Sequence, residues 1–525
     1  MKTFRSLFLR FFIFTLCGLL AFSSLDAGQR IGNKKRCHAK HRVIIVGAGL
    51  AGLTAAVDLK DKGWDVLVLE ANSRVGGRVL THRGEPFSSP NLYTEMGASF
   101  IDASHYEMLT LAERFNIPVA TQNHVNSAFP PGTFPSNFVF FYKNNRTQTA
   151  ANDPDAIQTA MDIGTYSSVD WPSQAHNTNP NRPQDQRADQ YHADAVVVDN
   201  TPDSDYIASL DFDPMSNYMI TKLDQGLWNA PVSDISNLYL TQQYGISADV
   251  VSGRNIYGLQ GGNDLLPKAM AQYLGKNVKL NSPVVKVEYK CEGVRVTVKQ
   301  QNGCKIKYRG DQVIMATPLP PTRKIKFCPP LPKIVEKAIA EIPAGPIYKI
   351  VVEYKTRFFD LLAGGPPNGA PLLFMLVDAS MNTNPQNPYT FGTAWCGNNQ
   401  YNSQAGLITM YITGPDAQWA EANLTDTEKV DFFIGQLNQV LPTGLEPANH
   451  TGNSVFQKWD KSQPWSGGGY IHYKPGQMIP YWPVWRLTLP GLSFAGEHTE
   501  VLAGFMESAV RSGHRVADSI GLPPR

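Results

Sequence analysis

The chain has 525 residues, of which 42% are hydrophobic and 18% are charged. This length and composition indicate a folded protein with more than one domain, and a formal net charge of only +2 gives no sign of a nucleic-acid partner. The six cysteines exclude a small disulfide-linked scaffold, and neither cysteines nor histidines have the spacing of a structural metal site, so no metal is expected.

The first predicted element is an export signal over residues 1–27. Basic side chains precede an apolar run from Phe11 to Phe22, and small and polar residues follow as far as Ala27. A run of this length is shorter than the roughly 20 residues that cross a bilayer, and the order is typical of a signal peptide. The sequence therefore predicts a secreted or periplasmic protein with no stable membrane span after cleavage. An uncleaved signal would instead be a membrane anchor.

A glycine-rich turn follows the first predicted strand, over residues 43–46. Gly47, Gly49 and Gly52 form G-x-G-x-x-G where a helix must begin, so free N–H groups and the positive end of the helix dipole are available to phosphate. The next predicted strand ends at Glu70, placed to bind a ribose. An isolated motif of this kind is often an ordinary turn. Here strand, turn, helix, strand and acid coincide, which predicts a dinucleotide site.

The residues after that acid indicate which dinucleotide binds. The segment from Glu70 to Arg78 reads E-x-x-x-R-x-G-G-R, which resembles a signature of flavoproteins of the amine oxidase superfamily. In that superfamily the arginine end of the signature lies against the diphosphate of FAD. The resemblance therefore implies FAD, not free NAD, as the cofactor.

Further segments resemble the flavin monoamine oxidase family, and the resemblance covers roughly residues 41–115, 255–350 and 456–520. The segment that passes the flavin is residues 93–101, the G-G-x-x-x-L motif lies in 257–266, and a buried strand ending in A-T-P is 313–318. The segment along the flavin ring is 466–470, the closing strand lies in 492–499, and the closing helix lies in 504–513.

The resemblance implies an α/β fold. A Rossmann-like FAD-binding domain of the GR2 type is interleaved with an α+β substrate-binding domain. We expect the substrate-binding domain to combine a helical lobe, residues 105–250, with a sheet, residues 329–455. The FAD-binding domain is expected to be assembled from residues 41–104, 251–328 and 456–525.

The matched motifs also imply a set of cofactor-binding residues. Val284, which follows a proline, is expected to offer its backbone to the adenine. Gly469 stands where mammalian monoamine oxidases have the cysteine joined to FAD, so a non-covalent flavin is expected. The full expected set is Gly47, Gly49, Leu50, Ala51, Gly52, Glu70, Ala71, Arg78, Gly97, Ala98, Ser99, Phe100, Val284, Gly496, Glu497, Gly504, Phe505, Met506 and Ala509.

Lys349 lies in a strand predicted over residues 343–354. A period of two places it on the same face as Glu353 and Lys355, which favours a solvent-exposed lysine. The resemblance implies the opposite, because Lys349 matches the family's lysine that holds a water molecule near flavin N5. We therefore expect Lys349 to be a catalytic residue.

The resemblance implies the chemistry of an amine oxidase. Such enzymes transfer a hydride from the carbon beside an amine to flavin N5, release an imine that water hydrolyses, and reoxidise the flavin with O2 to give H2O2. The amine must be uncharged, which a dry, apolar site favours. Tyr470 and Phe505 match the family's aromatic cage, with core packing as the alternative, and Trp459 lies in the segment along the flavin. These three residues and Lys349 are the expected catalytic set.

Phe100 bears on the substrate, because many L-amino-acid oxidases have at this position an arginine that pairs with the substrate carboxylate. Without that cation a primary amine is favoured over an amino acid. We therefore expect a secreted amine oxidase that converts a small-molecule amine and O2 to an aldehyde, ammonia and H2O2. The alternatives are an L-amino-acid oxidase with a relocated clamp and an inactive flavin-binding scaffold that binds a partner through residues 121–245. An oligomer is compatible with the sequence.

Three local patterns give further expectations. Ser104 and Glu107 have the spacing of a capping box, which predicts a helix through Phe115 with His105 at the surface of its first turn. Asn302-Gly303 predicts a β-hairpin. Residues 153–205 are rich in Asp, Asn, Gln and Pro, which indicates an extended surface insertion or a partly disordered segment.

Overall fold

The computed structural model describes residues 41–121, 195–246, 256–357, 404–440 and 449–524, with short strands at 139–141, 147–149, 373–376 and 393–396 and the single positions 158, 162 and 166. The predicted signal, residues 1–27, lies outside the described residues. Within the part of the chain that is described, no helix has both the length and the apolar character needed to cross a membrane.

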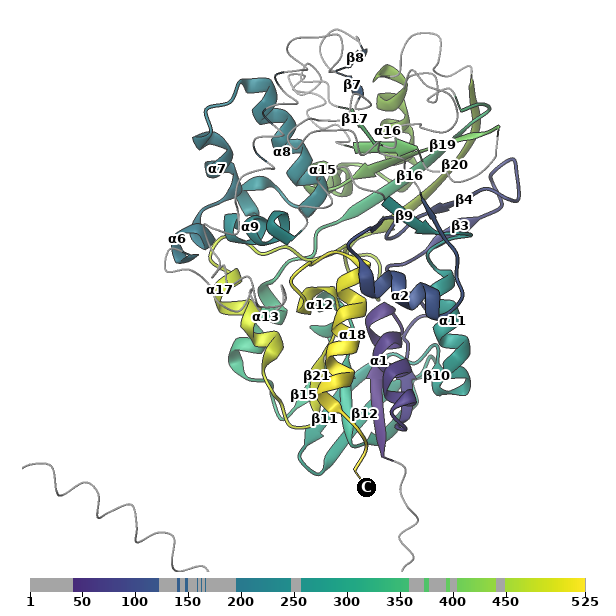
Figure 1. The fold of residues 1–525 in the computed structure, drawn as a ribbon, viewed down its shortest axis with the longest axis vertical. Helices are drawn as coiled ribbons and strands as arrows, with labels where there is room; N and C mark the ends of the chain where they lie inside the picture. Colours follow the sequence, from purple (N-terminus) through teal and green to yellow (C-terminus); the bar gives the residue numbers. More distant parts are fainter. Residues whose placement is uncertain are drawn as a thin grey trace, which may run out of the picture. The chain divides into compact units, whose positions relative to one another are not determined.

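A five-stranded parallel sheet forms one end of the described structure (Figure 1). Its strands come from three distant parts of the sequence in the order β10-β2-β1-β14-β21, which confirms the predicted α/β fold. Parallel strands are buried on both faces and are therefore continuous apolar runs, as in β1, where Val43, Ile44 and Ile45 are fully buried. The bounds are β1 Arg42–Val46, β2 Asp65–Leu69, β10 Val278–Lys279, β14 Gln312–Met315 and β21 Leu492–Phe494.

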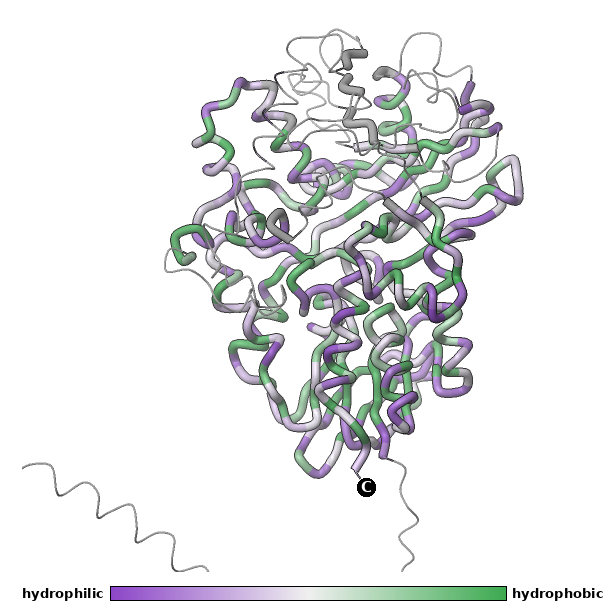
Figure 2. Tube along the Cα trace, viewed as in Figure 1, coloured by the Kyte–Doolittle hydropathy of each residue, from purple (hydrophilic) through white to green (hydrophobic). Residues whose placement is uncertain are grey.

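Helices cover one face of the parallel sheet. Val43, Ile45 and Val66 pack against this helical layer, and Figure 2 shows hydrophobic segments among the overlapping helices and strands at this end of the described structure. The first and last helices, α1 and α18, touch so closely that a Cβ atom at Gly513 would lie 2.7 Å from the carbonyl oxygen of Ala51. The bounds are α1 Leu50–Asp61, α2 Tyr106–Arg114, α11 Leu265–Leu274 and α18 Met506–Ile520.

A four-stranded sheet covers the other face. Its buried Val287 and Val296 lie in one apolar cluster with Ile44 and Leu67 of the parallel sheet. Strands β12 and β13 are antiparallel neighbours joined through Asn302-Gly303, which confirms the predicted hairpin. The bounds are β11 Val284–Lys290, β12 Gly293–Lys299, β13 Lys305–Gly310 and β15 Lys326–Cys328. Helices α12 Leu319–Thr322 and α13 Lys333–Glu341 are nearby in the chain, and α17 Met478–Tyr481 contacts α13.

A seven-stranded sheet forms the core of the substrate-binding part, in the order β20-β16-β19-β18-β17-β7-β8. Strand β20 continues to Trp459, past the expected boundary at residue 455, and the division of the chain into domain segments remains our proposal. The bounds are β7 Val139–Phe141, β8 Thr147–Thr149, β16 Ile347–Tyr354, β17 Leu373–Leu376, β18 Thr393–Cys396, β19 Gly406–Ile412 and β20 His450–Trp459, with covering helices α15 Gly414–Asn423 and α16 Asp426–Val440.

Strand β16 is buried along its whole length. Tyr348, Ile350 and Val352 pack against α15 and α16. The opposite face carries Lys349 and Glu353, which are 4% and 0% exposed. The solvent-exposed lysine favoured by alternation is therefore wrong, because both faces of this strand are covered and the second face meets the FAD-binding part.

A helical lobe lies beside the seven-stranded sheet (Figure 1). The lobe includes residues 195–205, which are the end of the segment rich in Asp, Asn, Gln and Pro. These residues are mainly helical, so the predicted disorder or surface insertion does not describe them. Helix α8 is tied to α15 by a buried ion pair in which Lys222 contacts Asp416 at 2.8 Å. The bounds are α6 Ala195–Asn200, α7 Asp203–Ser209, α8 Pro214–Trp228 and α9 Asn237–Ile246. Two short strand pairings, β3 Thr81–Arg83 with β4 Tyr93–Glu95 and β9 Ile256–Leu259 with β5 Ile101–Asp102 and β6 Val119–Thr121, complete the described sheets.

The start of α2 differs from the capping-box prediction. No side chain of its own segment caps the helix at His105. Instead the buried carboxylate of Glu507, from α18, accepts hydrogen bonds from the backbone N–H groups of Glu107 and Met108, at 3.3 and 2.8 Å. His105 is 1% exposed, so its predicted surface position is wrong. Burial against α18 is the reason, and no local pattern contains it.

We predict that Glu507→Gln lowers the free energy of unfolding by about 1–3 kcal/mol, because a buried donor or acceptor then loses a charge-assisted partner. Urea denaturation of the holoprotein, followed by circular dichroism, measures the change. Glu113→Gln, on the exposed side of α2, is the matched control and should leave the midpoint within error. Equal midpoints for both variants would contradict this account of the helix start.

Candidate active site

One cavity of about 810 Å³ is lined by the start of α1, the end of β2 and the inner face of β16. With one exception, every residue that the sequence predicted for the cofactor or the substrate lines this cavity. The exception is Gly52, which lies beneath the turn, where a Cβ atom would come 2.1 Å from the carbonyl oxygen of Gly47. The roles of these residues remain predictions, and their positions are those of a single site.

The glycine turn has the shape that a diphosphate needs. Gly47 has φ +108°, and its N–H donates to the carbonyl of Leu69 at 2.9 Å. A Cβ atom at Gly47 would lie 2.6 Å from the carbonyl oxygen of Ala316, whereas one at Gly49 would meet nothing within 4 Å. Because Gly49 precedes the first residue of α1, a phosphate can approach the free N–H groups of the helix closely.

Glu70 follows the last residue of β2 and binds the backbone of the glycine turn. Its carboxylate accepts hydrogen bonds from the N–H groups of Ala48 and Asn72, at 2.7 and 2.8 Å. Burial raises the pKa of Glu70, and these two backbone hydrogen bonds oppose the rise. Each carboxylate oxygen keeps a further lone pair, so the ribose hydroxyls of FAD would find acceptors here.

Arg78 joins the first and last segments of the cavity wall. Its Nη1 donates to the carbonyl of Gly469 at 2.6 Å and to the carboxylate of Glu497 at 2.9 Å. The other oxygen of Glu497 accepts the N–H of Gly504 at 2.9 Å. Three sequence-distant glycine-rich segments are thereby held around one space. These contacts and the open approach at Gly49 fit FAD.

A side chain at position 469 would collide with Ile347. A Cβ atom there would lie 2.1 Å from Cδ1 of Ile347, so a cysteine would require Ile347 to move. None of the described residues that line the cavity is a cysteine, and the described free cysteines, Cys291, Cys304 and Cys328, are exposed. These observations agree with a non-covalent flavin. In the described part of the chain, no cluster of His, Cys, Asp or Glu is placed to hold a metal ion.

Lys349 reaches into the cavity from the inner face of β16. Its Nζ donates to the carbonyls of Glu95 and Gly97, at 3.2 and 2.5 Å, and to the Ser99 hydroxyl at 2.6 Å. Burial lowers the pKa of Lys349 to about 7, although the Glu95 carboxylate favours the charged form. An ammonium group has three hydrogens for these three oxygens. The neutral amine has two, so deprotonation releases one partner and exposes a lone pair.

Glu95 is a buried acid that the site prediction did not include. Its carboxylate accepts the N–H of Asn263 at 2.7 Å and the hydroxyl of Thr81 at 2.9 Å. Burial raises the pKa of Glu95 to about 7, against these hydrogen bonds and the attraction of Lys349. Glu95, which belongs to the segment expected to pass the flavin, and Lys349 thus change charge in the same pH range.

Strand register places a row of side chains beside Lys349. Tyr411 of β19 lies directly opposite Lys349, and Thr393 of β18 lies opposite Tyr411. Trp395, two residues further along β18, packs against Tyr411 and Phe100 with ring centroids 5.5 and 5.2 Å apart. All of these residues line the cavity, so the end near Lys349 is walled mainly by aromatic rings.

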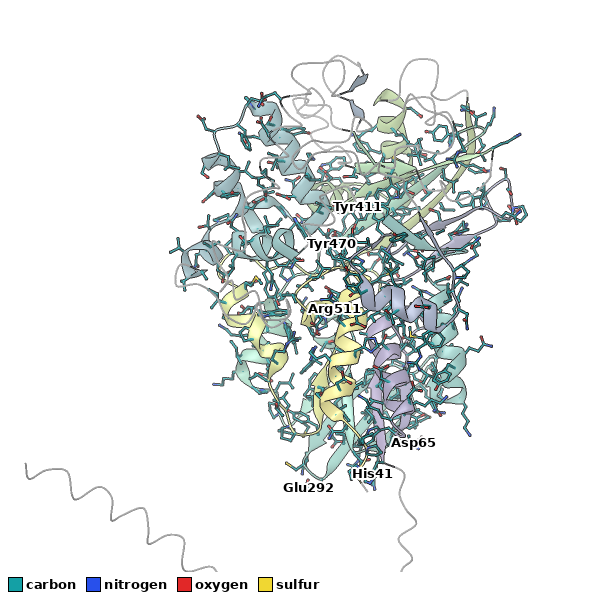
Figure 3. All side chains as sticks on the ribbon, viewed as in Figure 1. His41, Asp65, Glu292, Tyr411, Tyr470 and Arg511 are labelled. Atoms are coloured by element: carbon teal, nitrogen blue, oxygen red, sulfur yellow. The ribbon has the colours of Figure 1, made fainter. Side chains whose placement is uncertain are left out.

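Tyr470 lies at this end as well, and Phe505 lines the same cavity. The hydroxyl of Tyr470 donates to the carbonyl of Leu227 at 2.6 Å, and Figure 3 shows Tyr470 just beneath Tyr411, near the centre of the described structure. Phe505 packs edge-on against His105 with centroids 5.5 Å apart. The Trp459 indole donates to the carbonyl of Met96 at 2.8 Å, which anchors its ring to the segment expected to pass the flavin.

Sequence reasoning missed Tyr411, Trp395, Glu95 and the end of α8. The apolar run Gly406–Ile412 was the one available signal for Tyr411, because a short run of this kind indicates a buried strand. Only the pairing of β19 with β16 shows which of its side chains face Lys349. Leu227 contributes a backbone carbonyl, and the type of residue at a position does not predict such a role.

Fold and site together define an FAD-dependent oxidoreductase. Residues 50–521 match the family of flavin-containing amine oxidoreductases, and the chain belongs to this family. The predicted resemblance, the enzymatic nature of the protein and FAD as its cofactor are thereby confirmed.

Known relatives act on more than one kind of substrate. Flavin-containing amine oxidase B from Bos taurus is 27% identical over 515 residues, which cover 92% of this chain and 86% of that protein. L-amino-acid oxidase from Pseudechis australis is 25% identical over 510 residues, which cover 94% of this chain and 88% of that protein. Because the two identities are similar, they do not decide whether the substrate is an amine or an amino acid, and that choice has to be argued from the site.

The solved structure of cyclohexylamine oxidase from Brevibacterium oxydans IH-35A has the same fold, with a TM-score of 0.73 at 21% identity, covering 92% of this chain and 99% of that chain. Wild-type putrescine oxidase bound to putrescine also has a TM-score of 0.73, at 19% identity, covering 91% of this chain and 98% of that chain.

We predict that Lys349→Met slows anaerobic flavin reduction by substrate at least about 100-fold, as expected for loss of a positioned acid–base group. In the wild type this rate should rise with pH through about 7, because a neutral Lys349 offers a lone pair and no longer repels a cationic substrate. The variant should lack this rise. Stopped-flow absorbance near 450 nm measures both effects.

Lys355→Met is the matched control for this prediction, because Lys355 is exposed just beyond the end of β16. It should reproduce the wild-type rate and pH profile. A Lys349→Met enzyme that kept the rise near pH 7 would assign that ionisation to another group, with Glu95 the first to test.

Proposed function

We propose that the protein is a secreted amine oxidase that converts a primary amine, O2 and water to an aldehyde, ammonia and H2O2. The observation that carries the proposal is the aromatic end of the cavity, where Lys349 is buried with its pKa lowered to about 7 among Phe100, Trp395 and Tyr411. Such surroundings favour an uncharged amine, which has the lone pair that the reaction needs.

FAD, when bound, supplies the hydride acceptor and passes the electrons to O2. The chain's own residues prepare the substrate. The aromatic rings exclude water and hold the carbon chain of the amine by apolar contact. Lys349 offers a lone pair when neutral and donors when charged, so it can orient a water molecule for the reaction.

Three of the five cations that line the described part of the cavity are already engaged, which favours an amine over an amino acid. Among the described lining residues they are Arg74, Arg78, Lys299, Lys324 and Lys349. Arg74 donates to three backbone carbonyls, Arg78 is held by Glu497, and Lys349 is engaged by three oxygens. Phe100, at the expected clamp position, packs on Trp395 instead of presenting a charge. A substrate carboxylate would therefore enter the aromatic end without a free guanidinium partner.

An L-amino-acid oxidase is the second candidate, and its support is the 25% identity to the Pseudechis australis enzyme. It would require a carboxylate clamp from outside the described residues. An inactive flavin-binding scaffold is the weakest alternative, because the aromatic wall and the buried lysine are both in place.

The proposal predicts that a primary amine bleaches the flavin absorbance near 450 nm under anaerobic conditions and that L-amino acids do not. Purified holoprotein should be tested against monoamines, diamines, polyamines and L-amino acids, with aldehyde, ammonia and H2O2 measured after air is admitted. Bleaching by amino acids alone would establish the second candidate. No bleaching by any compound would favour the scaffold.

Secretion rests on the N-terminal sequence pattern. Expression in a secreting host should release a protein whose first residue follows Ala27 or a near neighbour, as read by N-terminal sequencing. Retention in the membrane fraction with an intact residue 1 would replace secretion by anchoring.

A further inference from the structure

The C-terminus of α8 provides fixed hydrogen-bond acceptors at the aromatic end of the cavity. The last four carbonyls of a helix have no partner within the helix. Gln225 accepts the Thr413 hydroxyl at 3.0 Å, and Leu227 accepts the Tyr470 hydroxyl at 2.6 Å. Asn229, which ends the helix with φ +56°, donates through its side chain to the carbonyl of Gly345 at 2.8 Å. The helix end is therefore held from several sides.

These acceptors determine the direction of a two-phenol chain. A carbonyl can only accept, so the single proton of Tyr470 goes to Leu227. Tyr470 then has no proton for Tyr411, whose oxygen lies 3.2 Å away. The proton of Tyr411 must therefore go to Tyr470. Burial raises the pKa of Tyr411 to about 12 and holds that of Tyr470 well above its ordinary value, so both phenols keep their protons at neutral pH.

We propose that Tyr411 is a specificity residue whose committed proton makes the two phenols at this end of the cavity accept hydrogen bonds and not donate them. Both phenols line the cavity, and with their protons directed along the chain toward α8 they offer only lone pairs to a substrate. An amine, which brings N–H donors, matches this arrangement. A carboxylate, which only accepts, does not. The negative end of the α8 dipole has the same preference.

This inference rests on the proposed function and explains how the site distinguishes an amine from the corresponding amino acid. It does not depend on an absent arginine. It depends on the acceptor at Leu227, because that carbonyl determines where the proton of Tyr470 goes and therefore where the proton of Tyr411 goes.

The test compares 2-phenylethylamine with L-phenylalanine, which differ only in the carboxylate. The quantity measured is the ratio of kcat/KM for L-phenylalanine to kcat/KM for 2-phenylethylamine, in the holoenzyme. Tyr470→Phe keeps both rings and frees the proton of Tyr411 to bind a carboxylate, so the ratio should rise about tenfold or more, the worth of a hydrogen bond to a charged group. Tyr411→Phe and the double variant should show no rise.

Tyr348→Phe is the matched control, because it removes a phenol hydroxyl from the opposite face of β16, where the nearest polar partner is Asp460 at 3.5 Å. Its ratio should equal that of the wild type. An unchanged ratio in Tyr470→Phe, or the same rise in the double variant, would overturn the role of Tyr411. Flavin absorbance of each variant reports whether the site has folded.

The two proposals fail in different ways. A wild-type enzyme that prefers L-phenylalanine would refute the proposed amine oxidase. The change in the ratio between Tyr470→Phe and the double variant would still decide whether the Tyr411 proton is what excludes a carboxylate.

Discussion

The buried amino group of Lys349 connects the two parts of the structure. It lies on β16, the second strand of the seven-stranded sheet, and its partners are two carbonyls and a hydroxyl from residues 95–99 of the FAD-binding part. A buried amine that lost such partners would cost several kcal/mol. The inner face of β16 and the segment from Glu95 to Ser99 are therefore held together, and both segments contribute to the wall of the cavity.

Much of the cofactor site was predictable because its signals are local. The family signature was needed for Arg78, but spacing alone places Gly47, Gly49 and Glu70 within one strand–turn–helix–strand unit. The hairpin at Asn302-Gly303 was predictable for the same reason. The family resemblance was needed to connect this unit with Gly469 and Glu497, because their contact with Arg78 spans about 400 residues of sequence.

The substrate end was less predictable because it depends on register and on backbone atoms. Alternation in β16 shows which side chains share a face, but it does not show whether that face meets water or another domain. Tyr411 faces Lys349 through the pairing of β19 with β16. His105 is buried because the carboxylate of Glu507 organises the helix start from 400 residues away. Each of these features requires two distant segments to be placed in three dimensions.

The closing helix has a consequence for the order in which the protein can fold. Helix α18 packs on α1, and the indole of Trp64 donates to the carbonyl of Gly521 at 2.9 Å. The ribosome makes α1 first and α18 last, and β21 leaves it only shortly before α18. Until then, the apolar side of α1 and one edge of the parallel sheet lack their partners, which exposes surface that favours aggregation. The parallel sheet and its helical layer are therefore completed only after most of the described chain has been synthesised, and until then the nascent chain exposes these apolar surfaces.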